Sequence, residues 1–320
     1  MHITSSRISM KNSNITRRNF IQITGIYASA TLLHPESGFS YQATSHLNPG
    51  VVDCHIHLWA PDKKRFPFHP DAPYIPEEVS SIEQYMADRE GSGIDIGIHV
   101  HAEPYQDDHR YTLYCLEKDH VHMRATCLFN PNDPKSPERM ENLVKGKPFV
   151  AVRVHSYSEE RAPQWDSSVF RKFWEKAGEL GIVLQIQLIP GYGKKLETMV
   201  KSYPDIPVLI DHLGRPAQGS PEEYESIMAL HKYPNVYMKF SGLDYASKES
   251  YPFRDAWHYV HRIAELFTPK RMVWGDSYKG GMGSKEYGQS MEIVHQVLSN
   301  LSLQDRHEVL GGTARRLFKL

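Results

Sequence analysis

The sequence has little cysteine, which excludes a disulfide framework. Its three cysteines, Cys54, Cys115 and Cys127, cannot all pair within one chain, and none has the close CxxC spacing of a structural zinc or redox site. The chain also lacks an excess of charge of either sign, since 37 Lys and Arg stand against 38 Asp and Glu. Because no long basic run occurs beyond the N-terminal region, we expect no nucleic-acid partner.

Long hydrophobic runs are absent too, so we expect no permanent membrane span. The uncharged run Ile21–Leu33 has about 13 residues, whereas a spanning helix needs roughly 20. It follows Arg17-Arg18-Asn19-Phe20, a pattern that resembles a twin-arginine export signal. We therefore expect residues 1–45 to be a signal peptide and linker for the twin-arginine export machinery. The protein would then act in the periplasm or be exported in another way.

Eight short apolar or β-branched runs follow, separated by stretches with helical spacing. This alternation is typical of repeated βα units and a parallel sheet. It predicts a single α/β domain over residues 50–320, a (β/α)8 TIM barrel rather than an open sheet. The predicted strands are Val51–Leu58, Ile94–Val100, His122–Leu128, Phe149–Val154, Ile182–Leu188, Val208–Ile210, Val236–Phe240 and Arg271–Trp274.

The segment Asp53-Cys54-His55-Ile56-His57 carries the strongest chemical signal. Residues two apart on a strand share a face, so we expect His55 and His57 to project inward near the end of the first strand. Neutral imidazole is the commonest metal ligand, and an HxH pair can supply two ligands to a catalytic ion. Because HxH also occurs by chance on exposed strands, the pair needs partners elsewhere in the chain.

Two later strand ends supply such partners. His212 directly follows the run Val208–Ile210, and Asp276 follows Arg271–Gly275. In a barrel the loops after the strands form the active face, so these side chains are expected beside the histidine pair. The loop 60–76 follows the first strand, and its aromatic residues either shape the pocket or pack on the barrel rim. These residues, with the one preceding the loop, are Trp59, Phe66, Phe68 and Tyr74.

The chain from about Val51 to Leu320 resembles the amidohydrolase-related barrels, in particular the branch of sugar-lactone and pyrone-dicarboxylate lactonases. The resemblance rests on VDCHIHLW at 52–59, RVH at 153–155, VLIDHLGRP at 208–216, KFSGL at 239–243 and ARRLF at 314–318. Decarboxylases of the same group share the HxH pair, the strand-six histidine and the strand-eight aspartate. The resemblance therefore indicates the superfamily more specifically than the reaction.

The resemblance implies a hydrolase that opens a sugar-derived lactone, a small-molecule substrate, with activated water. His55 and His57 would line a metal or water site that His212 faces, and Asp276 would be the general base and a possible metal ligand. The expected ion is a divalent metal, zinc first, although a metal-free site stays open. The implied catalytic residues are Asp276 and His212. The expected substrate-binding residues are Trp59, Arg153, His155, Gln187 and Tyr278.

The sequence departs from the pattern of the branch at two strand ends. Asp276 directly follows Gly275, where the branch usually has one residue between them, and a slip of one residue reverses the face of a strand side chain. No histidine ends the fifth strand, which has Gln185 and Gln187 instead. Two alternatives therefore remain, a metal-dependent decarboxylase of the same superfamily and a non-catalytic barrel that binds a carbohydrate.

Overall fold

The fold is an eight-stranded parallel barrel, as the sequence predicts. The computed structural model describes residues 50–278 and 280–320, so the predicted signal segment 1–45 lies outside the described residues. The strands pair in chain order from the first to the eighth, and every ladder is parallel. They are β1 (Val51–Ile56), β2 (Ile94–Val100), β3 (Met123–Leu128), β4 (Phe149–Ser156), β5 (Val183–Leu188), β6 (Val208–Ile210), β7 (Val236–Phe240) and β8 (Met272–Trp274).

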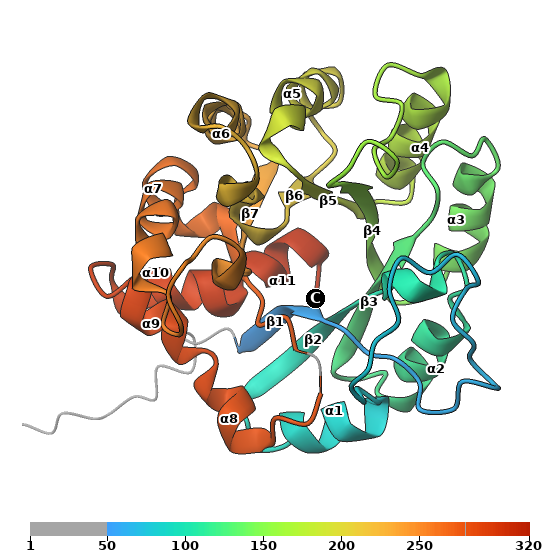
Figure 1. The fold of residues 1–320 in the computed structure, drawn as a ribbon, viewed down its shortest axis with the longest axis horizontal. Helices are drawn as coiled ribbons and strands as arrows, with labels where there is room; N and C mark the ends of the chain where they lie inside the picture. The colour runs from blue at the N-terminus through green and yellow to red at the C-terminus, as the bar shows by residue number, and fades with distance from the viewer. Residues whose placement is uncertain (1–49, 279) are drawn as a thin grey trace, which may run out of the picture. The chain divides into compact units, whose positions relative to one another are not determined.

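Helices surround the strands, and the C-terminus lies near the middle of the ring in the view of Figure 1. No described helix is long and apolar enough to cross a membrane. The helices are α1 (Ile82–Arg89), α2 (Arg110–Lys118), α3 (Ser136–Val144), α4 (Ser168–Glu179), α5 (Gly193–Ser202), α6 (Pro221–Met228), α7 (Trp257–Phe267), α8 (Ser284–Gln289), α9 (Glu292–Val297), α10 (Leu303–His307) and α11 (Thr313–Phe318).

One end of the barrel interior is apolar and is covered by α11. Ala314, Leu317 and Phe318 of this helix join the inward-facing strand residues in a single buried cluster. Removing these apolar side chains from water stabilises the closed barrel. The strand residues of the cluster are Val52, Cys54, Ile96, Ile98, Ala151, Val183, Leu209 and Val273.

A β-bulge sets the direction of the side chains at the end of β1. The ladder with β2 shifts between Asp53 and Ile56, so that one extra residue of β1 is accommodated there. Cys54 belongs to the interior cluster, whereas Ile56 packs in the outer core between the barrel and the helices. The bulge therefore changes the phase of the strand and lets His55 and His57 face the interior.

β8 closes the barrel against β1 through a few contacts rather than a full ladder. The His57 N–H donates to the Tyr278 carbonyl at 2.9 Å, and Ile56 and Tyr278 form an isolated parallel bridge. The Asp276 N–H donates to the Asp53 carboxylate at 2.9 Å. The ends of the first and last strands, which carry the predicted site residues, are thus joined directly.

Candidate active site

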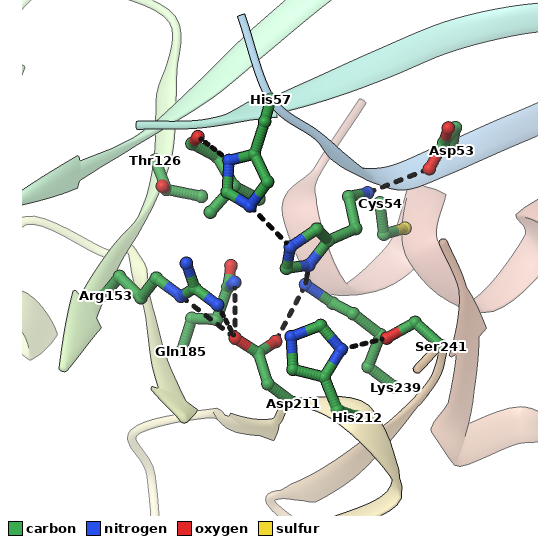
Figure 2. Close-up of polar contacts among 12 residues, drawn as sticks. Asp53, Cys54, His57, Thr126, Arg153, Gln185, Asp211, His212, Lys239 and Ser241 are labelled. Carbon is green, nitrogen blue, oxygen red and sulfur yellow. Dashed lines mark hydrogen bonds and ion pairs between the residues drawn. The ribbon is translucent and has the colours of Figure 1, made fainter. Parts of the chain in front are cut away.

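A buried polar layer lies next to the apolar interior of the barrel. The inward residues two positions beyond Ala151, Val183 and Leu209 are Arg153, Gln185 and Asp211, and Lys239 occupies this layer on β7. Figure 2 shows three of these side chains converging on the carboxylate of the fourth, Asp211. The change from apolar to polar along each strand marks the active end of the barrel.

Asp211 is the centre of the polar layer. Arg153 donates to its Oδ2 from Nε at 3.1 Å, and the Arg153 Nη2 lies 3.0 Å from the same oxygen. The Gln185 amide donates to Oδ2 at 3.0 Å, and the Lys239 Nζ lies 2.9 Å from Oδ1. Burial opposes ionisation of Asp211, but the charges of Lys239 and Arg153 outweigh it and hold the pKa well below its usual range. The carboxylate is therefore ionised and fully engaged.

A chain of short contacts joins Lys239 to the histidine pair. Lys239 Nζ lies 3.3 Å from His55 Nδ1, and the Nε2 atoms of His55 and His57 are 3.0 Å apart. His57 Nδ1 lies 3.0 Å from the Val100 carbonyl oxygen at the end of β2. The two rings converge as the spacing of the motif predicts. Burial and nearby positive charge lower the pKa of both histidines well below the usual range, so both are neutral at neutral pH.

His212 reaches the same place from an unusual turn after β6. Its backbone and that of Leu213 adopt left-handed conformations, with φ of 51° and 56°. This turn puts the His212 ring 4.6 Å from that of His55, and its Nδ1 lies 2.9 Å from the Ser241 Oγ. Burial lowers the pKa of His212 to about 3, so it too is neutral. A non-glycine residue pays a conformational cost in this region, which is typical of functional sites.

A cavity of about 500 Å³ opens above these histidines. Three of the residues predicted to bind substrate, Trp59, Arg153 and Gln187, line it. Tyr74 lines it as well, whereas Phe66 packs on Tyr111 and Phe68 on Tyr105. The full lining is His55, His57, Trp59, Tyr74, Pro76, Glu77, Glu78, Glu103, Arg153, Tyr157, Gln187, His212, Arg215, Tyr245 and Ser277.

Arg215 adds a second cation to this cavity. Its guanidinium lies over the rings of Tyr245 and Tyr157, with centroid distances of 5.1 Å and 5.8 Å. Its Nε is buried and has no hydrogen-bond partner among the described residues. The two rings hold the guanidinium in the cavity lining without neutralising its charge.

The carboxylate of Glu103 does not cancel these cations. The Tyr157 hydroxyl donates to it at 2.8 Å, and His155 Nδ1 and Arg161 Nη1 lie 3.2 Å and 2.5 Å from its Oε1. Burial opposes ionisation of Glu103, but these partners lower its pKa to about 2. The other two carboxylates of the lining, Glu77 and Glu78, are exposed at the rim. The inner cavity is therefore left with the positive charges of its arginines.

Asp276, the predicted general base, does not line this cavity. It lines a separate cavity of about 780 Å³ beside α8 and α9, while the following residue, Ser277, lines the cavity of the histidines. The Ser277 backbone is left-handed, with φ of 66°. Burial and, to a smaller extent, the charge of Asp53 raise the pKa of Asp276 to about 7. The missing residue between Gly275 and Asp276 thus leaves a serine where an aspartate was expected.

Two predicted substrate-binding residues also lie elsewhere. His155 is buried against Glu103 and lines a third cavity, on the far side of that carboxylate. Tyr278 points to the helix layer, where its hydroxyl donates to Asp88 at 2.7 Å, and it lines the same cavity as Asp276. His155 therefore contributes by holding Glu103 in place.

The donor set does not fit a divalent cation well. His55, Asp211 and His212 bring one potential ligand atom each within 4.8 Å of one another, the single such group in the described part of the chain. However, both oxygens of Asp211 already face Arg153, Gln185 or Lys239. A metal-binding histidine donates its other ring N–H to an acceptor, but the His55 Nδ1 faces the Lys239 ammonium. The occupied donors and the local positive charge outweigh the proximity of the three ligand atoms.

Asp211, Lys239 and Arg215 were not singled out from the sequence, although they lie within the quoted motifs VLIDHLGRP and KFSGL. The periodicity of the strands could have identified Asp211 and Lys239. A charged residue two positions after a buried apolar one, as in Leu209 and Asp211, must face the barrel interior. Two such charges of opposite sign on neighbouring strands predict an ion pair, because parallel neighbours lie about 4.8 Å apart.

Comparison with known proteins identifies the family of the chain. The family model described as Amidohydrolase matches residues 52–320. The chain is 25% identical over 276 residues to a 4-sulfomuconolactone hydrolase of Hydrogenophaga intermedia. The matched region covers 84% of this chain and 89% of that relative.

Solved structures share the fold. A probable 2-pyrone-4,6-dicarboxylic acid hydrolase of Acinetobacter baumannii, with citric acid bound, is 17% identical at a TM-score of 0.72 and covers 85% of this chain and 100% of that one. An amidohydrolase of Burkholderia multivorans with bound zinc is 18% identical at a TM-score of 0.67, over 84% and 99%. Since the family model spans the whole barrel, the chain belongs to the amidohydrolase family.

Proposed function

We propose that this protein hydrolyses a small lactone that carries an anionic group. The observation that carries the proposal is the combination, in one cavity, of neutral imidazoles with two arginines, Arg153 and Arg215. The imidazoles can move a proton, and the guanidinium groups can bind a carboxylate or sulfonate. The similarity to a 4-sulfomuconolactone hydrolase supports the lactone as the bond that is cleaved. A sugar-derived lactone, the substrate class expected from the sequence, meets the same description when it carries a carboxylate.

His57 is the best-placed general base. Its Nδ1 lies against the Val100 carbonyl, which can only accept a hydrogen bond, so the proton is on Nδ1 and the lone pair is on Nε2. In the proposed reaction a water molecule replaces the His55 ring as the hydrogen-bond donor to His57 Nε2, and Nε2 takes a proton from this water as the water oxygen attacks the lactone carbonyl. Arg153 stabilises the negative charge that develops on the carbonyl oxygen. The ring C–O bond then breaks, and the protonated His57 returns its proton to the leaving oxygen to give the hydroxy acid.

Particular residues bear on the two alternative functions, a decarboxylase and a barrel that only binds a ligand. The decarboxylase alternative needs a tightly held divalent ion, and the hydrogen bonds of His55 and Asp211 do not favour one. The binding-only alternative is motivated by the position of Asp276, which faces another cavity. It depends on whether His57 supplies the base that Asp276 does not.

The test compares two variants in a pH-indicator assay against a panel of anionic and neutral lactones, with and without chelator. We expect wild type to release acid from an anionic lactone, His57→Gln to lower kcat by about 10²- to 10⁴-fold, and Asp276→Asn to stay within about threefold of wild type. Chelator should change none of these rates. Acid release from no lactone would favour the binding-only barrel, and loss of turnover in Asp276→Asn alone would return the role of base to Asp276.

We also propose export through the twin-arginine pathway. The support is the Arg17-Arg18 pair before a short uncharged apolar run. In a bacterial host that has this pathway, the full chain should accumulate in the periplasmic fraction, and replacing both arginines with lysine should retain it in the cytoplasm. Equal export of the two chains would contradict the proposal.

A further inference from the structure

We infer that Lys239 is a positioning residue that fixes the tautomers of His55 and His57, so that the pair is a proton donor and acceptor rather than a metal site. The catalytic consequence of this inference rests on the proposed function. The tautomers themselves do not, because they follow from hydrogen bonds within the protein.

The first step concerns the protonation of Lys239. Its side chain is fully buried, and its Nζ lies 2.9 Å from the Oδ1 of the ionised Asp211. A buried amine this close to a buried carboxylate is stable as the ammonium, because either charge alone would be strongly destabilising. An ammonium has three N–H donors and no lone pair, so Lys239 can only donate.

The second step follows the protons through the histidines. Because Lys239 donates, His55 Nδ1 at 3.3 Å must accept, and the proton of the neutral His55 ring is on Nε2. At the other end, His57 donates from Nδ1 to the Val100 carbonyl and keeps a lone pair on Nε2. The 3.0 Å contact between the two Nε2 atoms is then a hydrogen bond from His55 to His57. One assignment satisfies every contact in the chain.

The third step concerns metal ions. A histidine that binds a metal through Nε2 needs its lone pair there and its proton on Nδ1, donated to an acceptor. His57 has this arrangement, but His55 has the reverse. Binding a metal through both rings would require His55 to move its proton to the nitrogen that faces Lys239. Lys239 therefore lowers the affinity of the site for a divalent ion and leaves His57 Nε2 as a proton acceptor.

The tautomers can be read directly by NMR. In chelator-treated protein labelled with ¹⁵N-histidine, two-bond ¹H–¹⁵N correlations show which ring nitrogen carries the proton, and His55→Gln and His57→Gln variants assign the two signals. We expect an Nε2–H tautomer for His55 and an Nδ1–H tautomer for His57 in wild type. An Nδ1–H tautomer for His55 would overturn the inference, and this measurement needs no folded Lys239 variant.

Lys239→Met removes the donor while keeping the length of the side chain. We expect His55 to change to the Nδ1–H tautomer and the affinity for added Zn²⁺ to rise by at least about tenfold, because groups that hydrogen-bond to the outer nitrogen of a metal-binding histidine have effects of this size. Asp211 keeps its ion pair with Arg153 in this variant, so the buried carboxylate is not left unpaired. Unchanged tautomers, or zinc affinity equal to that of wild type, would contradict the inference.

These readouts separate the inference from the proposed function. A protein with the expected tautomers and no turnover of any lactone would leave the role of Lys239 intact and reject the substrate. A lactonase whose His55 carries its proton on Nδ1 would do the opposite.

Discussion

Charged side chains in the interior of a barrel need a reason, because a buried ion pair is a weak source of stability. Arg153, Lys239 and Asp211 together carry one net positive charge beneath three neutral imidazoles. The cations are fixed before substrate arrives, so they can stabilise a developing oxyanion without reorganisation. The same charge disfavours a divalent cation at this position and favours an anionic ligand.

Arg215→Gln tests the anionic part of the proposed substrate. The change removes the charge and keeps a polar side chain, so KM for an anionic lactone should rise by about 10- to 100-fold, with little change for a neutral one. Steady-state kinetics on matched anionic and neutral substrates provide the measurement. Arg262→Gln is the control, because Arg262 pairs with Glu225 on the surface. An equal rise in KM for both substrates would mean that Arg215 shapes the cavity but does not select for a charged substrate.

Asp276→Asn should stabilise the protein at high pH. Burial raises the pKa of Asp276 from 3.8 to about 7. The unfolded chain therefore loses this proton at lower pH than the folded one, and stability falls as pH rises from about 4 to 7. The variant should remove the penalty, giving on the order of 1 to 3 kcal/mol at pH 8 and almost nothing at pH 4. Denaturant titrations at both pH values measure it, and a benefit independent of pH would contradict the burial of this carboxyl.

The positions of some site residues could be predicted from the sequence, and the positions of others could not. His55 and His57 share a face as their spacing predicts, but the bulge of β1 decides which face, and the left-handed turn after β6 brings His212 to them. The position of Asp276 could not be predicted, because β8 ends at Trp274 and the backbone after it leaves strand geometry, with Ser277 in a left-handed conformation. The roles of Trp59 and Tyr74 depend on how the loop of residues 60–76 folds back on the barrel. Tertiary contacts rather than local sequence determine this conformation.

The close approach of the end of β8 to β1 depends on Gly275. A Cβ on Gly275 would lie 2.7 Å from the His55 Cβ and 3.0 Å from the His55 nitrogen. Only a residue without a side chain lets β8 approach the bulge of β1 this closely. The bulge and the glycine together position the first histidine of the pair.

Gly275→Ala should therefore displace His55 and lower activity by at least tenfold, with about 1 to 3 kcal/mol lost from the free energy of unfolding. Turnover and denaturant midpoints are measured side by side. Gly191→Ala is the matched control, because its Cβ would meet only the end of the flexible Glu223 side chain, at 3.1 Å. Full activity in Gly275→Ala would show that β1 can move without loss of function.

The strands were the most predictable elements. The predicted bounds of β2, β6 and β7 equal the observed ones, and the other strands differ by one or two residues at an end, because apolar runs between turn residues mark buried parallel strands well. Between β8 and α10 the chain forms two short helices, α8 and α9, rather than one continuous helix. Gly288 packs on the Ser92 carbonyl, and the Ser290 hydroxyl donates to the Tyr287 carbonyl, so this stretch follows tertiary contacts rather than helical spacing.

For the molecule as a whole, α11 stabilises the barrel from the end opposite the site. Its side chains belong to the same buried cluster as Val52, Leu209 and Val273 from distant strands. Stability and chemistry are thus located at opposite ends of the barrel, which allows each to be altered separately.

Phe318→Ala should lower the free energy of unfolding by about 3 to 5 kcal/mol, because it leaves a cavity under the strands. We expect one cooperative transition at lower denaturant and an unchanged KM. Leu303→Ala, at a side chain that is 55% exposed, is the control and should change stability by less than about 0.5 kcal/mol. A separate early transition in Phe318→Ala would mean that α11 unfolds independently of the barrel.

The closure of β8 on β1 also bears on how the protein folds. The hydrogen bond from Asp276 to Asp53 joins residues 223 positions apart, and the contact of Lys239 with His55 spans 184. Contacts this remote form late, because the chain must first lose the entropy of closing a long loop. During refolding, helical structure should thus return before activity does, and the recovery of turnover reports the moment at which the two ends of the sheet meet.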